Sequence, residues 1–197
     1  MDSRPFSQAC ENNQQPILEI IQPLFSEVNE VLEIGSGTGQ HAVYFGKAMP
    51  HLRWQCSDRI ENHDGINAWR EWAGLSNVLP PLVLDVNAAW PIENTPAIFC
   101  ANVIHIISWS EVEKLFSSFA QYLRKPGIVC LYGPYNYNGQ FTSESNARFD
   151  QWLKDRDPRS GIRDFEKVNA LAQAAGLSLQ ADHAMPANNR CLVWRLV

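Results

Sequence analysis

The residues best suited to chemistry lie in a glycine-rich stretch, VLEIGSGTGQHAVYF, from Val31 to Phe45. Three glycines, Gly35, Gly37 and Gly39, stand two apart, after an apolar run and before a helix-like segment. Glycine lets the backbone approach a ligand closely, and the start of the following helix supplies unpaired N–H groups and a partial positive charge. The stretch therefore predicts a turn that binds a nucleotide-type cofactor.

The spacing of the glycines separates the possible cofactors. A phosphate-binding P-loop needs a lysine directly after its glycines, and this turn has none. The dinucleotide fingerprint G-x-G-x-x-G would place its third glycine at Gln40, whereas the chain has Gly39. Tyr44 and Lys47 are one residue too close for the Tyr-x-x-x-Lys pair of short-chain reductases. The spacing thus disfavours both phosphate-loop and nicotinamide chemistry.

The segment Glu33–Gly39 resembles the acidic-x-Gly-x-Gly-x-Gly signature of class I S-adenosylmethionine-dependent methyltransferases. The resemblance implies that the glycines lie against the methionine part of the cofactor. It also implies that Glu33 adds negative charge near the cofactor's ammonium and sulfonium groups. The alternative is a tight strand–helix turn without a ligand.

The same resemblance gives roles to residues after the next three strands. Asp58 stands about 20 residues beyond the turn, where an acidic residue binds the ribose hydroxyls. Asp85 is expected near the adenine amine, and Val86 can offer its backbone N–H to the ring. The end of strand four is expected beside the transferred methyl group. The full set of expected S-adenosylmethionine contacts is Glu33, Gly35, Ser36, Gly37, Thr38, Gly39, His41, Asp58, Arg59, Asp85, Val86, Asn102 and Val103.

His105 is the candidate catalytic base. It lies just past strand four, on the side where ligands bind in such sheets. The ordinary pKa of histidine suits proton transfer near neutral pH, and an oxygen or nitrogen acceptor benefits from a base. The alternative is a structural histidine that is hydrogen-bonded to the backbone.

Alternating apolar patterns predict an α/β fold with a mostly parallel sheet covered on both faces. The strands are expected at Glu30–Ile34, Leu52–Ser57, Leu82–Val86, Ala97–Ala101 and Ile128–Tyr132, followed by an antiparallel pair at Leu179–Ala184 and Cys191–Leu196. Helices are expected from Pro16, from Thr38 to Pro50, at Asn67–Trp72, after a capping box of Ser110 and Glu113, and from Asp164 to Gly176. This order is typical of the three-layer, Rossmann-like class I methyltransferase fold, with seven strands and a C-terminal hairpin. We expect one domain over residues 1–197, with a helical N-terminal cap at 1–29.

The polar, aromatic segment 133–163 interrupts this rhythm and predicts an irregular lid over the methyl acceptor. The expected substrate contacts are Asn13, Tyr132, Tyr135, Asn146, Phe149, Asp150, Arg163, Met185, Asn188 and Asn189. Ordinary turn chemistry is the alternative for the loop. Arg163 could equally form an ion pair, and the asparagines of Met185–Asn189 could satisfy local backbone groups.

Composition limits the class of protein. The 197 residues, 45% of them hydrophobic, predict a globular protein. A net charge of -5 argues against a nucleic-acid partner. No apolar run could span a bilayer, and the polar N-terminus lacks a signal-peptide core, so a cytoplasmic location is expected. The five cysteines include no C-x-x-C pair. We therefore expect no metal site, and expect four of the cysteines to be buried. The oligomeric state stays open.

Most of the chain also resembles one methyltransferase-like family of unknown reaction, found in bacteria and eukaryotes. The matching segments include PIL, VLEIGSGTGQHAVYF, WQCSD, PLVLDV, NVIHI, YGPY, SNARFD, RDP, GIRD and MPANN. This resemblance implies the class I methyltransferase fold and S-adenosylmethionine binding, and it leaves the substrate open. The chain departs from the family near the N-terminus, where Glu11-Asn12-Asn13 stands in place of an Arg-Asn pair. It departs again at Ser108-Trp109, where Pro-Trp is common.

The leading hypothesis is an S-adenosylmethionine-dependent methyltransferase that acts on a small molecule. The chain lacks the Asn-Pro-Pro-Tyr pattern of many enzymes that methylate base or amide nitrogens, and it has no basic arm. The alternatives are a non-catalytic protein of this fold that binds the cofactor or a partner, and a protein or RNA methyltransferase.

Overall fold

Residues 4–197 are described by the computed structural model. They fall into two units, one running to Cys100 and the other beginning at Ala101. The first unit contains α1 (Gln8–Leu24), β1 (Glu30–Ile34), α2 (Gln40–Ala48), β2 (Arg53–Asp58), η1 (Ile60–Asn62), α3 (His63–Ala73), β3 (Val78–Val83) and β4 (Thr95–Ala101). The second contains α4 (Trp109–Tyr122), β5 (Leu123–Asn136), α5 (Glu144–Arg156), β6 (Arg163–Asp164), α6 (Phe165–Ala174), β7 (Leu177–Met185), η2 (Pro186–Asn188) and β8 (Asn189–Leu196).

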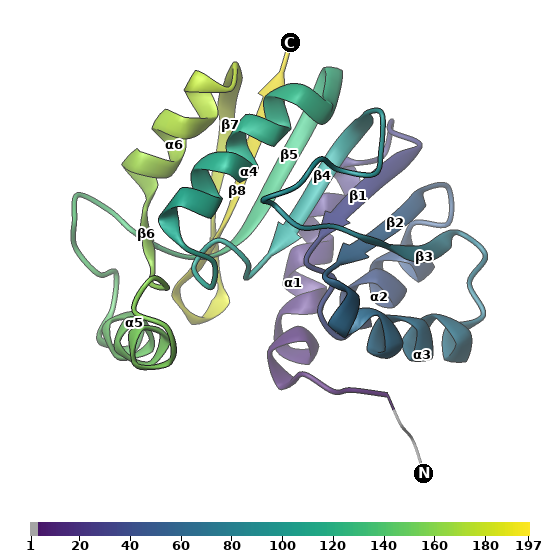
Figure 1. The fold of residues 1–197 in the computed structure, drawn as a ribbon, viewed down its shortest axis with the longest axis horizontal. Coiled ribbons are helices and arrows are strands. Elements are labelled where there is room, and N and C mark those ends of the chain that lie inside the picture. The colour runs from purple at the N-terminus through teal and green to yellow at the C-terminus, as the bar shows by residue number, and fades with distance from the viewer. Residues whose placement is uncertain (1–3) are drawn as a thin grey trace. The chain divides into compact units, whose positions relative to one another are not determined.

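The first unit is built on a parallel sheet with the strand order β3-β2-β1-β4. Four of the five residues of β1 are buried, as expected for a parallel strand covered on both faces. The helix α2 lies between α1 and α3 (Figure 1). Phe45, Trp54 and Phe99 form an aromatic core with ring centroids 5.5–5.8 Å apart. This core supports the turn between β1 and α2.

The second unit is built on an antiparallel sheet. β8 pairs with both β5 and β7, which confirms the predicted C-terminal hairpin. The short β6 adds a parallel pair to the end of β5, with Tyr135 opposite Arg163. Figure 1 shows α4 and α6 side by side in front of these strands, and each of them contacts a strand of the sheet.

The first helix begins earlier than predicted. Pro16 was expected to open it, but α1 starts at Gln8, and Pro16 lies inside. Ser7 is the N-cap, and its hydroxyl accepts the N–H of Cys10. A proline removes one backbone hydrogen bond from a helix. Burial of Ile17 and Ile21 offsets that loss.

The third strand is also shifted, from the expected Leu82–Val86 to Val78–Val83. It contains Pro80 and Pro81, which are tolerated because β3 is at the edge of the first unit's sheet. Asp85 consequently follows the strand by two residues and does not lie inside it.

The capping box of α4 is formed by Ser108 and Glu111, and not by Ser110 and Glu113. The Ser108 hydroxyl accepts the Glu111 N–H, while the Glu111 carboxylate accepts the Ser108 N–H at 2.8 Å. Ser110 stands inside the first helical turn because the helix already begins at Trp109.

The segment 133–163 is more regular than predicted, because β5 continues to Asn136 and α5 occupies Glu144–Arg156. Ser143 caps α5 by accepting the N–H of Asn146. Two of the three buried residues of α5, Asn146 and Asp150, are polar. The helix therefore lacks the apolar stripe from which helices are predicted.

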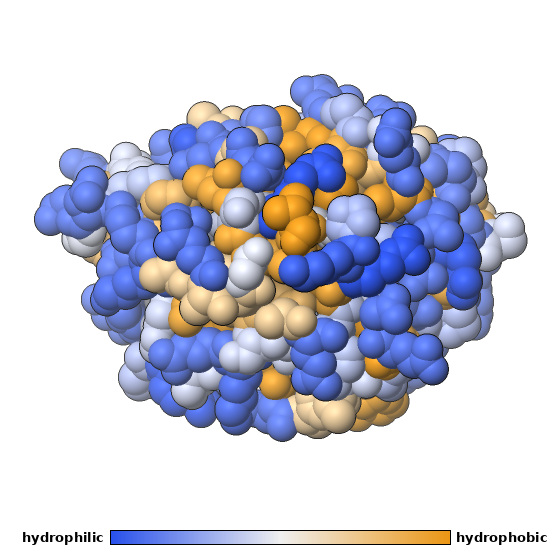
Figure 2. All heavy atoms as spheres, turned by 90° about the horizontal axis from the view of Figure 1, so that it is seen from above, coloured by the Kyte–Doolittle hydropathy of each residue, from blue (hydrophilic) through white to orange (hydrophobic). Residues whose placement is uncertain are grey.

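One face of the surface is mainly hydrophilic, as expected for the globular protein that the composition predicts (Figure 2). Figure 2 shows a face on which most residues are hydrophilic and hydrophobic residues lie among them. As predicted, Cys56, Cys100, Cys130 and Cys191 are buried. Between residues 4 and 197, no helix is long and apolar enough to cross a membrane.

Candidate functional site

The glycine turn between β1 and α2 has three left-handed residues, Gly35, Gly37 and Gly39, with φ values of 72°, 57° and 91°. The N–H groups of Gly35 and Ser36 both donate to the carbonyl of Ser57, at 3.0 Å each. The Gly39 N–H donates to the Ser36 carbonyl at 2.9 Å. The turn is thus tied to the end of β2 and adopts a backbone shape that side chains disfavour.

Two of these glycines serve different purposes. A Cβ atom on Gly39 would lie 2.9 Å from the Cα of Ile66, so Gly39 allows α3 to pack against the turn. A Cβ atom on Gly37 would meet nothing within 4 Å, and Gly37 is exposed. Gly37 is therefore the position at which a ligand can approach the backbone of the turn.

Glu33 lies beneath the turn and is only 2% exposed. Its carboxylate accepts hydrogen bonds from the Ser36 hydroxyl at 2.7 Å and from the Trp54 indole N–H at 3.0 Å. Burial raises the pKa of Glu33 to about 7, although these two donors oppose the shift. Glu33 braces the turn from inside, and its electrostatic role toward a cofactor stays a prediction.

Asp58 lies at the end of β2, directly beside the turn. Its Oδ2 accepts the N–H of Gly37 at 2.7 Å. Its Oδ1 accepts the N–H of Arg59 and the side-chain amide of Asn62, both at 2.8 Å. A carboxylate has about four acceptor positions, so Asp58 is fixed in place with room for a further donor such as a hydroxyl.

His41 and Asn13 form a buried pair at the start of α2. The His41 Nε2 lies 2.7 Å from the Asn13 Oδ1. Burial lowers the pKa of His41 to about 4, so the ring is neutral and donates to Asn13. The pair attaches α1 to the helix that follows the glycine turn. Thr38 contacts the same helix through Gln40, with 3.1 Å between Thr38 Oγ1 and Gln40 Oε1.

Asp85 has a local role in the structure. Its Oδ1 accepts the backbone N–H of Asn87 at 2.8 Å and the Asn87 side-chain amide at 3.1 Å, which is turn chemistry. Its carboxylate is nevertheless exposed, and Val86 beside it is partly exposed. Contact of either residue with adenine stays a prediction.

In the second unit, Asn102 adopts a left-handed conformation (φ 59°), and its N–H donates to the Tyr132 carbonyl at 2.8 Å. The Val103 carbonyl accepts the N–H groups of Ile106 and Ile107. Non-glycine residues with such φ values are uncommon and are often found at functional sites. The chain therefore makes a left-handed, hydrogen-bonded turn directly before His105.

His105 is 2% exposed. Its ring packs edge-on against Phe149 of α5, with centroids 5.5 Å apart. Its Nδ1 is buried and makes no hydrogen bond within residues 4–197. Burial, with the nearby positive charge of Arg163, lowers the pKa of His105 to about 4. The imidazole is therefore neutral at physiological pH and has a lone pair able to accept a proton.

Asp150 and Arg163 are occupied by contacts within the protein. Asp150 accepts the Ile162 N–H at 2.8 Å and pairs with Lys154 at 2.5 Å. Arg163 donates to the carbonyls of Ile104, Ile107 and Arg159. The structure thus favours a local role for both side chains.

The remaining expected substrate contacts form hydrogen bonds within the protein or lie buried. Asn146 donates to the Asn188 carbonyl at 3.2 Å, and Asn188 donates to the Ser145 hydroxyl at 3.3 Å, so α5 meets the β7–β8 hairpin here. The Asn189 amide donates to the carbonyl of Pro186 at 3.2 Å. Tyr132, Tyr135 and Met185 are buried.

No individual role could be assigned from the sequence to three further residues: Trp54, Ser160 and Gly161. Trp54 anchors Glu33, and the other two contact the His105 loop. Ser160 and Gly161 lie within the predicted lid 133–163, and Gly161 begins the GIRD segment. Within residues 4–197, no cluster of His, Cys, Asp and Glu is suited to a metal ion.

The chain matches one protein-family model and is similar in structure to several solved proteins. A family model described as "Protein of unknown function (DUF938)" matches residues 4–196. An O-methyltransferase family protein from Burkholderia thailandensis has a TM-score of 0.84 at 13% identity, covering 95% of this chain and 57% of that one. An O-methyltransferase family 2 protein from Planctomyces limnophilus, solved with apigenin, has a TM-score of 0.77 at 14% identity, with coverages of 93% and 62%. Human N-acetylserotonin methyltransferase, solved with SAM, has a TM-score of 0.78 at 14% identity, with coverages of 95% and 52%.

These likenesses confirm the predicted class I methyltransferase fold. The chain spans only between 52% and 62% of the length of these three proteins. At such low identity the comparison establishes the fold, and function has to be argued from the sites.

Proposed function

The chain belongs to the DUF938 family, and from its fold and its two sites we propose that it is an S-adenosylmethionine-dependent methyltransferase acting on a small-molecule acceptor. The glycine turn carries this proposal. Its backbone is exposed at Gly37, and the carboxylate of Asp58 is fixed 2.7 Å from the Gly37 N–H. A ligand with a polar chain and a ribose has matching partners here.

The residues fit S-adenosylmethionine in chemical type. Gly37 and the N-terminus of α2 would face the methionine part, and Asp58 would accept hydrogen bonds from the ribose. Asp85 and Val86 would contact the adenine. The cofactor, when bound, supplies a methyl group on a sulfonium. The protein's own task is to hold the acceptor in line and to exclude water.

His105 would take the proton of the acceptor's hydroxyl or amine. Its lowered pKa keeps the ring unprotonated, which is the form a base requires, and makes it a weaker base than an ordinary histidine. The segment 133–163, which includes α5, would cover the acceptor, as small-molecule sites generally need concave walls. Single-domain organisation over residues 1–197 is part of this proposal.

Calorimetric titration with S-adenosylmethionine and S-adenosylhomocysteine tests the cofactor site. Gly37→Ala should abolish binding, whereas Gly74→Ala should not. The two glycines match, because their φ values are 57° and 61° and neither Cβ would meet an atom within 4 Å. Both substitutions introduce the same backbone strain, and only Gly37 lies on the turn. Absence of binding by the unaltered protein at millimolar ligand would refute the proposal.

Methyl transfer is tested by incubating the protein with labelled cofactor and a metabolite extract, followed by mass identification of the product. His105→Ala should lose turnover while cofactor binding persists. Label in the polymer fraction of a whole extract would instead indicate a protein or RNA substrate.

A non-catalytic, cofactor-binding role is the second candidate. It is favoured by the burial of His105, whose side chain is the only base proposed for the reaction. Tight cofactor binding without methyl transfer to any extract fraction would support it over the enzyme.

A further inference from the structure

The loop that carries His105 is held through its backbone. Four consecutive carbonyls, those of residues 104–107, each accept a hydrogen bond from the segment Ser160–Arg163. The Arg163 Nε donates to Ile104 at 3.0 Å, and the Gly161 N–H donates to His105 at 2.9 Å. The Ser160 hydroxyl donates to Ile106, and the Arg163 Nη2 donates to Ile107. Such a run of tertiary bonds to one loop fixes the direction of its side chains.

The segment Ser160–Arg163 is itself attached to α5. The Ile162 N–H donates to Asp150 Oδ1 at 2.8 Å. A Cβ atom on Gly161 would lie 2.9 Å from the same oxygen, so this contact requires glycine. Phe149, next to Asp150, packs against the His105 ring. One helix thus holds both the backbone and the ring of His105.

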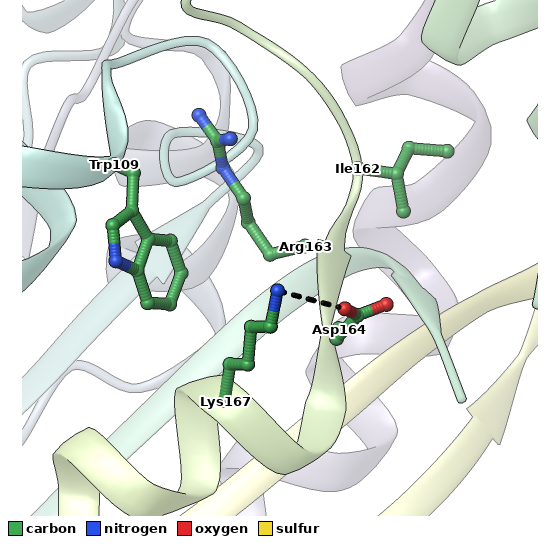
Figure 3. Close-up of a pocket in the computed structure, with 5 residues that line it drawn as sticks. All are labelled: Trp109, Ile162, Arg163, Asp164 and Lys167. Atoms are coloured by element: carbon green, nitrogen blue, oxygen red, sulfur yellow. Dashed lines mark ion pairs between the residues drawn. The ribbon is translucent and has the colours of Figure 1, made fainter. Parts of the chain in front are cut away.

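Arg163 brings a positive charge that no carboxylate among residues 4–197 neutralises by an ion pair. Figure 3 shows its side chain extending away from Asp164, which pairs with Lys167 at 3.5 Å. On α5, Asp150 pairs with Lys154, and its carboxylate also favours the charged form of Arg163 without an ion pair. Of the charged groups on the elements packed against the loop, Arg163 is therefore the one that opposes a second positive charge on His105.

We propose that Ser160–Arg163 is the positioning element of His105, with Arg163 as its central residue. Arg163 has two functions here: its guanidinium spans two carbonyls of the loop, and its charge adds to the effect of burial in disfavouring protonation of the imidazole. The inference rests on the proposed function for its catalytic consequence, but its structural part can be tested without any methyl acceptor.

The first test is NMR of ring-labelled histidine at pH 5 in three variants. With the His105 pKa at about 4, only a minority of the rings are protonated in the unaltered protein. Arg163→Gln removes the positive charge and should raise this pKa, so that a larger fraction of the rings is protonated. Arg163→Lys keeps the charge and should resemble the unaltered protein. Arg159→Gln is the matched control, because that arginine is exposed and pairs with Asp157. Equal protonation in all four proteins would overturn the electrostatic part.

The second test is hydrogen exchange at the amides of Ile106 and Ile107. Lysine cannot span two carbonyls as a guanidinium does, so Arg163→Lys should speed exchange, as should Ser160→Ala. Arg159→Gln should not. Both informative variants make small changes and keep the test valid even where Arg163→Gln does not fold. Exchange at the unaltered rate in both would overturn the positioning role.

Once an acceptor is known, Arg163→Lys should lower kcat on the order of ten-fold with little change in KM, since only the geometry of the base is disturbed. An unchanged kcat would overturn the catalytic consequence. If the unaltered protein transfers no methyl group, the proposed enzyme function fails, while the NMR and exchange results still decide the positioning role.

Discussion

The indole N–H of Trp54 donates to the carboxylate of Glu33 across 3.0 Å, in a site from which water is almost excluded. The first acidic residue of the glycine signature is therefore anchored in the aromatic core of the first unit. The protonation state of Glu33 therefore depends on its burial in the folded protein as well as on any bound ligand.

The buried Glu33 should make stability depend on pH. Its folded pKa of about 7 exceeds the ordinary value of 4.5, so the protonated form is favoured and stability is lost as pH rises from 4.5 through 7. Glu33→Gln keeps the shape without the charge. We expect it to be more stable than the unaltered protein by about 3 kcal/mol at pH 8, and by much less at pH 5. Urea unfolding at both pH values measures this, and an equal difference at the two would contradict it.

Two of the buried histidines, His41 and His105, should act in the opposite direction. His41 and His105 have folded pKa values of about 4, below the ordinary 6.5. Their contribution to stability is complete above pH 6.5 and is lost as pH falls toward 4, by about 3 kcal/mol each. His41→Gln should flatten the decline between these pH values. An acid unfolding curve identical to that of the unaltered protein would argue against the shift.

The buried hydrogen bond between Asn13 and His41 should contribute measurably to the stability of the protein. Asn13→Ala leaves the His41 ring N–H buried without its acceptor and should cost about 1–3 kcal/mol in the free energy of unfolding. The neighbouring Asn12 is exposed and bonds only Gln8, so Asn12→Ala should change stability by about 0.5 kcal/mol or less. Equal costs for the two substitutions would show that the buried pair contributes nothing.

Gly39 and Gly37 should differ sharply on substitution by alanine. Both pay the cost of a left-handed alanine, about 1–2 kcal/mol. Gly39→Ala also forces its Cβ to within 2.9 Å of the Ile66 backbone and should cost at least about 1 kcal/mol more. Chemical denaturation of the two variants gives the comparison. A smaller loss for Gly39→Ala would mean that α3 can move away without cost.

The hairpin between β7 and β8 contains Ala187 and Asn188, both left-handed, with φ values of 55° and 58°. Asparagine and glycine tolerate this conformation better than alanine does. Ala187→Gly should therefore stabilise the protein by about 0.5 kcal/mol, the strain relieved exceeding the entropy that glycine loses. Ala184→Gly, in the regular part of β7, should destabilise by a similar amount. The same sign for both would contradict the strained turn.

The parts of the fold that follow from apolar periodicity could be predicted from the sequence. β1 was predicted with its bounds, and β4 within two residues, because a buried parallel strand is a continuous apolar run. α5 could not be predicted, since two of its three buried residues are polar and are held by hydrogen bonds. Its inward face depends on partners far away in the chain.

The candidate site shows the same division. Spacing located the glycine turn and Asp58, which the fold brings to a 2.7 Å contact. The burial of Glu33 and the carbonyl contacts of Arg163 depend on tertiary packing. A pattern can identify a residue type and its position in the chain, but the direction of its side chain is set by neighbours such as Trp54.

The two prolines of β3 have a consequence for association. Pro80 and Pro81 have no N–H group and lie in the outermost strand of the first unit's sheet, where Pro80 is exposed. A strand from another molecule adds to such an edge by a series of backbone hydrogen bonds. Because successive N–H groups of a strand point to opposite sides, one of the two missing donors belongs to this open edge. The prolines thus protect the protein against edge-to-edge aggregation, a risk that the exposed Val83 beside them would otherwise increase.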